Sequence, residues 1–211
     1  MFDVMAMTAA RMKEIVDELS SRDKNFADAA KRFPLCRLGQ REVTASHFES
    51  LVESVVSQQL SVKAADTIYG RVVTLVGGQV TPQSIANAPE EKLRQAGLSG
   101  AKLKTIRGLA DATLSERIRV NELHEIEDDE LVVSQLTSLW GIGSWTVDMF
   151  MMSQLGRLDI WPTGDVGVRR GWQKINVLNE PVDEKALHAA GTKFAPYRSV
   201  VAWYCWQAAD E

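Results

Sequence analysis

The chain has 211 residues, of which 45% are hydrophobic and 25% charged, and its net charge is −4. That length suits one domain or two closely packed lobes. No stretch approaches the roughly 20 apolar residues that cross a bilayer, and the first residues lack the long apolar core of a signal peptide. Two cysteines and three histidines are too scattered for a zinc or iron–sulfur site. We therefore expect a protein of a reducing compartment without membrane contact.

Apolar residues at helical spacing run through almost the whole chain. Ser46, followed three residues later by Glu49, is a capping signal, and Thr81-Pro82 is another. The predicted helices cover residues 9–19, 25–33, 47–58, 62–75, 101–112, 129–136, 144–155, 166–175, 183–193 and 198–208, with short ones after 81 and 89. Strand signals are weak, so the sequence predicts an all-α fold of short helices joined by brief loops.

Basic residues concentrate in one part of the chain. Residues 92–119 hold seven Lys or Arg, whereas residues 121–130 hold six acids. A negative total charge argues mildly against a nucleic-acid partner, but the local potential matters more for binding a polyanion. The basic run also fits an ordinary solvated helix face, and both interpretations stay open at this point.

Residues 139–143, Leu-Trp-Gly-Ile-Gly, form a glycine hairpin directly before a predicted helix. Gly141 and Gly143 allow a tight turn and the close approach of a ligand. The helix begins at Ser144, and its first N–H groups carry the positive end of the helix dipole. Such a place binds phosphate without a side-chain charge, although a plain turn between two helices has the same local pattern.

Asp165 stands between Gly164 and Gly167, at the start of the helix predicted over 166–175. The simpler interpretation is an N-cap, a role that suits aspartate. The second interpretation places its carboxylate beside the molecule whose phosphate the hairpin holds. That pairing suggests chemistry on a nucleic-acid strand.

The longer pattern L-x-G-I-G-x-W-T-x-x-x-F, which begins at Leu139, resembles the helix-hairpin-helix of base-excision DNA glycosylases. Residues 162–171 resemble the catalytic segment of the same superfamily, named HhH-GPD. The closest resemblance is to the 3-methyladenine DNA glycosylase II family, over residues 45–210. Residues 51–65 are similar to that family's first core helix and wedge loop, and residues 194–199 to its closing W-x-P-[WY]-R-S segment.

The resemblance implies a single all-α HhH-GPD module of two lobes with the active site in the interlobe cleft. One lobe would comprise residues 1–40 and 165–211, and the other residues 45–160, with the helix-hairpin-helix at about 131–155. It implies a base excision repair enzyme that flips out an alkylated purine, such as 3-methyladenine or 7-methylguanine, and hydrolyses its N-glycosidic bond with the help of Asp165.

Two differences from relatives narrow the implied activity. Relatives that also cut the strand have a lysine two residues after the hairpin's last glycine; here that residue is Trp145, so the resemblance implies a monofunctional enzyme without AP lyase activity. Relatives with an iron–sulfur loop have four clustered cysteines, of which only Cys205 is present. Three departures affect the pocket: Trp140 replaces a proline, Met149 a tyrosine, and Val166 an aromatic residue.

The resemblance also assigns residues to each role. The wedge that fills the gap would be Gln59 and Leu60; the DNA backbone would contact Gly141, Gly143, Ser144 and Trp145; the base pocket would hold Trp145, Trp206, Met149 and Val166; and the carbonyls of Thr137, Leu139 and Ile142 would hold a sodium or potassium ion. Ordinary packing is an equally good interpretation of the wedge residues and of Trp206.

The expected partner is double-stranded DNA with damaged bases, bound by a monomer in the bacterial cytoplasm or the eukaryotic nucleus, without a further cofactor. Two alternatives stay open. One is a related glycosylase for deaminated, oxidised or mismatched bases, which would also use Asp165. The other is a non-catalytic helix-hairpin-helix module, for which Asp165 would be dispensable, no base would be released, and binding to undamaged duplex would be weak and salt-sensitive.

Overall fold

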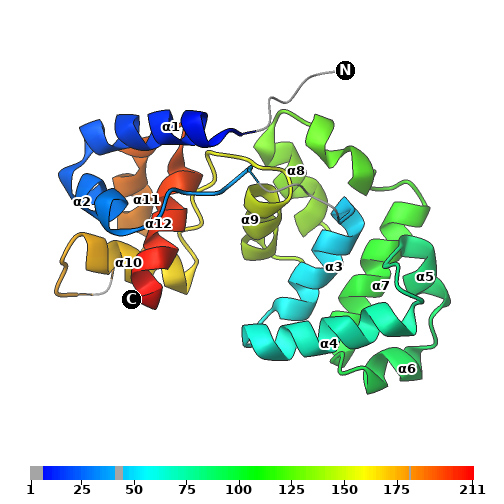
Figure 1. Ribbon diagram of the computed structural model, residues 1–211. Helices are drawn as coiled ribbons and strands as arrows, with labels where there is room; N and C mark the ends of the chain where they lie inside the picture. Colours follow the sequence, from blue (N-terminus) through cyan, green and yellow to red (C-terminus); the bar gives the residue numbers. More distant parts are fainter. Residues whose placement is uncertain (1–6, 41–44, 181) are drawn as a thin grey trace. The chain divides into compact units, whose positions relative to one another are not determined.

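A computed structural model describes residues 7–40, 45–180 and 182–211, and every regular element within these ranges is helical (Figure 1). The helices are α1 (Ala9–Arg22), α2 (Lys24–Arg32), α3 (His47–Ser57), α4 (Val62–Leu75), α5 (Pro82–Asn87), α6 (Glu90–Gln95), α7 (Gly100–Leu114), α8 (Asp129–Thr137), α9 (Ser144–Ser153), α10 (Val166–Ile175), α11 (Glu184–Gly191) and α12 (Arg198–Asp210), with 3₁₀ turns η1 (Val120–Glu125) and η2 (Thr192–Phe194). The all-α prediction is confirmed. Within the described part of the chain, no helix is long and apolar enough to span a membrane.

Side-chain caps explain why most helices begin where they do. The Ser46 hydroxyl accepts the Glu49 N–H at the start of α3, and Thr81 and Ser84 form a reciprocal capping box at α5. Two predicted helices extend at least two residues too far. The segment predicted to reach 155 ends at Ser153, because the chain turns at Gly156 with a φ of +67°. The segment predicted over 183–193 is α11 followed by the short turn η2.

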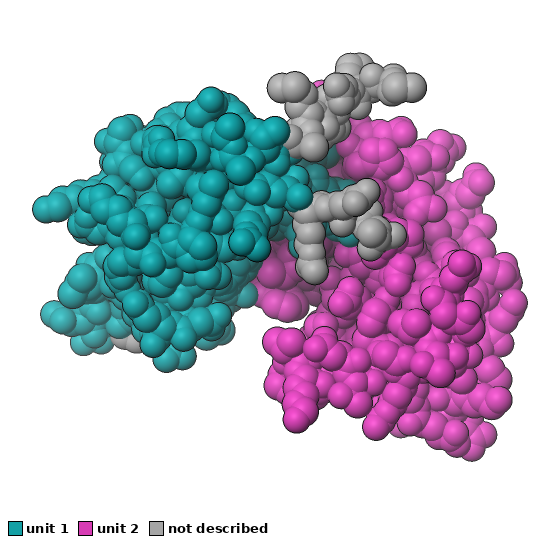
Figure 2. All heavy atoms as spheres, in the orientation of Figure 1, with its two compact units in different colours: residues 1–42, 151–211 teal, residues 43–150 magenta. Residues whose placement is uncertain are grey.

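The chain divides into two compact units, residues 1–42 with 151–211 (unit 1) and residues 43–150 (unit 2) (Figure 2). Residues 151–160, which the sequence analysis assigned to the second lobe, belong to unit 1. The reason is a set of long-range contacts to the start of α12. The Ser199 N–H donates to the Leu158 carbonyl at 2.8 Å, and the Ile160 N–H donates to the Ser199 hydroxyl at 2.8 Å.

Unit 1 is built on the crossing of α10 and α12. Gly171 of α10 lies so close to the Cys205 carbonyl of α12 that a Cβ at this position would overlap it. Helix α2 packs beside this pair and α1 packs against α2, with Phe26 of α2 in edge contact with Tyr204 of α12. The close crossing places α12 directly behind the first turn of α10, where Asp165 lies.

Unit 2 has α3 at its centre. Its apolar face is fully buried, and α3 contacts α4, α7 and η1. Helix α7 also packs against α5 and α6. The turn η1 was not predicted, since the acidic residues around it carry no helical period. Helices α3 and α7 together therefore support the α3–α4 loop and the hairpin that follows α8.

Candidate active site and nucleic-acid interface

Asp165 is the N-cap residue of α10 and is partly buried. Its Oδ1 accepts two hydrogen bonds, one from the Val168 N–H at 2.8 Å and one from the Trp206 indole N–H at 2.9 Å. The first is the cap that the simpler interpretation predicted. The second comes from α12 and has no role in capping. An oxygen that accepts two N–H groups is well placed to carry negative charge.

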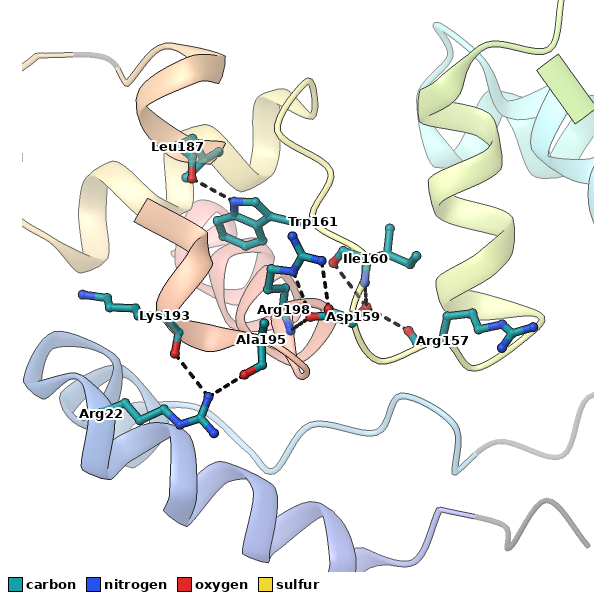
Figure 3. A network of polar contacts seen from close by, with 10 residues as sticks. Arg22, Arg157, Asp159, Ile160, Trp161, Leu187, Lys193, Ala195 and Arg198 are labelled. Carbon is teal, nitrogen blue, oxygen red and sulfur yellow. Dashed lines mark hydrogen bonds and ion pairs between the residues drawn. The ribbon is translucent and has the colours of Figure 1, made fainter. Parts of the chain in front are cut away.

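The loop that leads to Asp165 is held by the start of α12 and by α11 (Figure 3). Arg198 donates two hydrogen bonds to the carboxylate of Asp159, both at 2.8 Å. The Trp161 indole donates to the Leu187 carbonyl at 2.8 Å. A planar guanidinium paired with a carboxylate through two bonds fixes direction as well as distance, so Asp165 follows a segment of defined geometry. This contact gives Arg198 a structural role in the loop.

Trp206 lies against Asp165 within unit 1. A Cβ at Gly167 would come within 2.9 Å of the Trp206 ring and 3.1 Å of Asp165 Oδ1, so glycine keeps this corner compact. Burial, and after it the negative charge of Asp165, raise the pKa of the Cys205 thiol next in the chain. Val166 is 69% exposed beside Asp165. The sequence did not indicate that the Trp206 indole N–H points to the carboxylate.

The glycine hairpin connects α8 and α9. Its turn is closed by the Ile142 N–H, which donates to the Leu139 carbonyl at 3.1 Å. Gly141 has a φ of +84°, and a Cβ there would overlap the side chain of Thr105 in α7. Only glycine therefore fits at Gly141. At Gly143 a Cβ would meet open space, so this glycine leaves the backbone accessible.

The residues that open α9 are exposed. Gly143 and Ser144 lie at the surface, and the side chain of Trp145 is 38% exposed. Met149, one turn further on, is half-buried. Exposed N–H groups at the start of a helix can bind an anion, and the phosphate site at this position stays a prediction. On the other side of the turn, the Leu139 carbonyl already accepts one hydrogen bond, and a carbonyl oxygen has two acceptor positions.

The loop between α3 and α4 carries the predicted wedge. Gln59 has a φ of +56°, and Leu60 is 38% exposed. Val62, which follows in α4, is 79% exposed. An apolar side chain at the tip of a loop, outside any core, is the arrangement that a wedge requires. The packing interpretation of these two residues does not match their exposure.

Sequence reasoning missed three residues near the two loops. Gln58 donates from its amide to the Gly141 carbonyl at 3.1 Å, and Lys102 donates to the Gln58 carbonyl at 2.8 Å. The Lys104 ammonium lies 4.2 Å from the centre of the Trp140 ring, a cation–π contact. Both lysines belong to the basic run of residues 92–119. The spacing of basic residues in that run does not show which of them contacts the protein and which faces solvent.

The described residues contain neither a group of metal ligands nor an exposed thiol. Among residues 7–40, 45–180 and 182–211, no three His, Cys, Asp or Glu side chains lie together in a way that can hold a metal ion. Cys36 and Cys205 are both buried free thiols. Burial raises the pKa of Cys36 to about 12.

A family model described as HhH-GPD superfamily base excision DNA repair protein matches residues 52–196 of this chain. That match spans the wedge loop, the hairpin and Asp165. Among curated proteins, DNA-3-methyladenine glycosylase 1 of Schizosaccharomyces pombe is 31% identical over 191 residues, which cover 90% of this chain and 84% of the relative.

Two solved structures share the fold over most of their length. A DNA-3-methyladenine glycosidase from Bacillus halodurans is 38% identical, with a TM-score of 0.81, over 92% of this chain and 88% of that one. A 3-methyladenine DNA glycosylase of Schizosaccharomyces pombe in complex with abasic DNA is 28% identical, with a TM-score of 0.80, over 92% and 95%.

Proposed function

We propose, because this chain belongs to the HhH-GPD superfamily of base excision DNA repair proteins, that it is a DNA glycosylase that removes alkylated purines from duplex DNA. Similar proteins carry the name DNA-3-methyladenine glycosylase, and one of them was solved with abasic DNA, the product of such a reaction. The substrate class proposed here is therefore a purine alkylated on a ring nitrogen, such as 3-methyladenine or 7-methylguanine.

The observation that carries the proposal is the carboxylate of Asp165. It sits at a partly buried corner of unit 1, with one oxygen held by Val168 and Trp206. Cleavage of an N-glycosidic bond develops positive charge on the sugar. A carboxylate fixed in advance beside that charge stabilises the transition state without having to reorganise.

The reaction follows from the charge of the substrate. A purine alkylated at N3 or N7 is cationic, so the glycosidic bonding electrons leave with the base, which becomes neutral, and no general acid is needed. The remaining oxocarbenium-like sugar faces Asp165. Water then adds to the anomeric carbon and loses a proton, which leaves an abasic site. Trp206, beside Asp165, would contact the flipped base, because an electron-rich ring attracts a cation by about 0.5–2 kcal/mol, and Trp145 is a second candidate for this role.

Unit 2 would supply the hold on DNA. The base must leave the stack, at a cost of a few kcal/mol, and Gln59 and Leu60 would fill the gap. The N–H groups of Gly141, Gly143 and Trp145 would bind the backbone phosphate. The carbonyls of Thr137, Leu139 and Ile142 would hold a monovalent cation that bridges to the same phosphate.

The enzyme is further proposed to be monofunctional. Trp145 stands where strand-cutting relatives have their lysine, so no Schiff-base amine is present at that position. It would act as a monomer without an iron–sulfur cluster, in the bacterial cytoplasm or the eukaryotic nucleus.

The test is base release from methylated duplex DNA by the wild type and by Asp165→Asn. The asparagine side chain keeps an oxygen for both N–H donors, so the fold should persist while release falls about a hundredfold or more. Alkali-labile but uncut sites are expected. Release by both proteins at equal rates would remove Asp165 from the mechanism. Binding without release by the wild type would favour the non-catalytic alternative.

A further inference from the structure

Two DNA-facing loops of unit 2 are joined by the side chain of Gln58, the last residue before the wedge. Its amide has two N–H groups, and each has an acceptor: the Gly141 carbonyl at 3.1 Å and the Thr146 hydroxyl at 2.9 Å. Gly141 lies in the hairpin, and Thr146 is a buried residue of the first turn of α9. One side chain therefore links the α3–α4 loop to the hairpin and to the first turn of the helix that follows it.

A second side chain holds the same loop from α7. The Lys102 ammonium donates to the carbonyls of Val56 and Gln58, at 2.7 and 2.8 Å. These carbonyls end α3, where the helix dipole is negative and where no backbone donor follows within the helix. Burial lowers the pKa of Lys102. The ammonium group thus serves as a C-cap, which the solvated-face interpretation of the basic run did not predict.

Helix α7 also supports the hairpin, one turn further along. Thr105 is buried and lies directly under Gly141, where a Cβ would overlap its side chain. Lys102 and Thr105 are three residues apart, so they share one face of α7. That face contacts the wedge loop through Lys102 and the hairpin through Thr105, while Gln58 closes the link between the two loops.

We propose, building on the proposed function, that Gln58 and Lys102 are positioning residues that couple the wedge to the hairpin. The hairpin can hold the backbone of any duplex, whereas Leu60 can enter the stack only where a base is missing or flipped out. Two contacts on one duplex succeed together only at the spacing that the duplex imposes. A fixed link between the loops sets that spacing before DNA binds. The entropic cost of ordering the wedge loop then does not reduce the affinity for DNA.

The proposed coupling affects the preference for an abasic over an undamaged duplex, not the affinity for DNA in general. Gln58→Met keeps the length of the side chain but removes both donors. We expect binding to undamaged duplex to stay near the wild-type level, while the preference for a duplex with a tetrahydrofuran abasic analogue falls about tenfold. A tenfold change corresponds to about 1.4 kcal/mol, which the loss of two hydrogen bonds can supply. Lys102→Met should lower the same ratio, and Lys102→Arg, which keeps donors at the α3 carbonyls, should restore it.

The measurement is the ratio of dissociation constants for the two duplexes, by fluorescence anisotropy, with thermal melting of each variant. Gln83→Met, on the exposed surface of α5 in the same unit, is the matched control. A cycle with Leu60→Ala separates coupling from general damage: once the wedge is gone, Gln58→Met should change the ratio little.

The outcomes separate the two proposals. A wild type that does not distinguish the duplexes would overturn the proposed function and this inference with it. A wild type that distinguishes them, with Gln58→Met unchanged or lowering both affinities equally, would overturn the coupling alone. The same holds if Gln58→Met and Leu60→Ala act additively.

Discussion

At the scale of single residues, Asp165 shows how one side chain serves structure and chemistry at once. Its Oδ1 caps α10 through Val168 and accepts the Trp206 indole N–H. The N-cap interpretation is therefore correct, and it does not compete with the catalytic one. A cap holds a carboxylate at the positive end of a helix, which is also how a fixed negative charge is kept near a reacting cation.

Trp206→Phe tests the second hydrogen bond to Asp165. An aromatic ring is kept, although a smaller one, but the donor to Oδ1 is lost, so the carboxylate gains freedom to turn. We expect single-turnover base release to slow about tenfold, with a stability loss of about 1 kcal/mol. Trp203→Phe is the control, since Trp203 lies on the same helix in edge contact with Tyr204. Equal rates for the wild type and both variants would contradict a positioning role for the indole N–H.

At the scale of elements, glycine positions decide how closely helices approach. Gly141 and Gly143 lie two residues apart in the hairpin, but their surroundings differ: one lies against Thr105 and the other faces open space. Gly171 lies against the backbone of α12. The three glycines therefore differ in structural role, which the residue type alone does not show: Gly141 and Gly171 allow close packing, and Gly143 leaves the backbone accessible.

Gly141→Ala and Gly143→Ala should separate folding from binding. Alanine at Gly141 must take a φ of +84° and overlap Thr105, so we expect a loss of about 1–3 kcal/mol in the free energy of unfolding. Alanine at Gly143 should leave stability unchanged but weaken duplex binding about tenfold, because its methyl group would stand between the helix N–H groups and a phosphate. Urea unfolding and duplex titration check the pair. Normal binding by Gly143→Ala would place the phosphate elsewhere.

Gly171→Ala tests the crossing of α10 and α12. The added Cβ would overlap the Cys205 carbonyl, and backbone cannot move aside as a side chain can, so we expect a loss of about 3 kcal/mol. Gly108→Ala in α7 is the matched control. A Cβ there meets nothing within 4 Å, and it should stabilise the helix by about 0.5–1 kcal/mol. Thermal melting that shows no difference between the two variants would contradict the close crossing.

At the scale of the whole molecule, the net charge of −4 argues against a nucleic-acid partner, but it is a poor guide for this fold. The proposed phosphate site uses backbone N–H groups, which need no side-chain charge. Meanwhile two lysines of the basic run already have partners in the protein. Lys102 donates to the α3 carbonyls, and the exposed Lys104 lies over the ring of Trp140. Total charge therefore says little about this kind of DNA binding.

Acid should destabilise the folded protein through His47. Its Nε2 lies 3.2 Å from Nδ1 of His124, and its ring packs on Phe150. Burial, and then His124, lower the pKa of His47 below its usual 6.5. The unfolded chain thus takes up a proton first, so this stability is present above pH 6.5 and is lost as the pH falls through the lowered pKa.

Urea unfolding at neutral and mildly acidic pH measures this effect. His47→Gln should lose less stability on acidification than the wild type, while His188→Gln, an exposed histidine of α11, should behave like the wild type. An unchanged acid dependence in His47→Gln would show that other groups are responsible.

Most of the fold and part of the site could be predicted from the sequence alone. Helix α10 begins and ends at the expected residues, and the hairpin and Asp165 stand where the local pattern put them, because helical period, caps and glycine turns act over a few residues. Tertiary structure alone decided the partners across long separations: Gln58 with Gly141, Trp206 with Asp165, and residues 151–160 with α12. These contacts depend on how the helices pack. The local patterns of a sequence do not show how far apart in space two residues lie when many residues separate them in the chain.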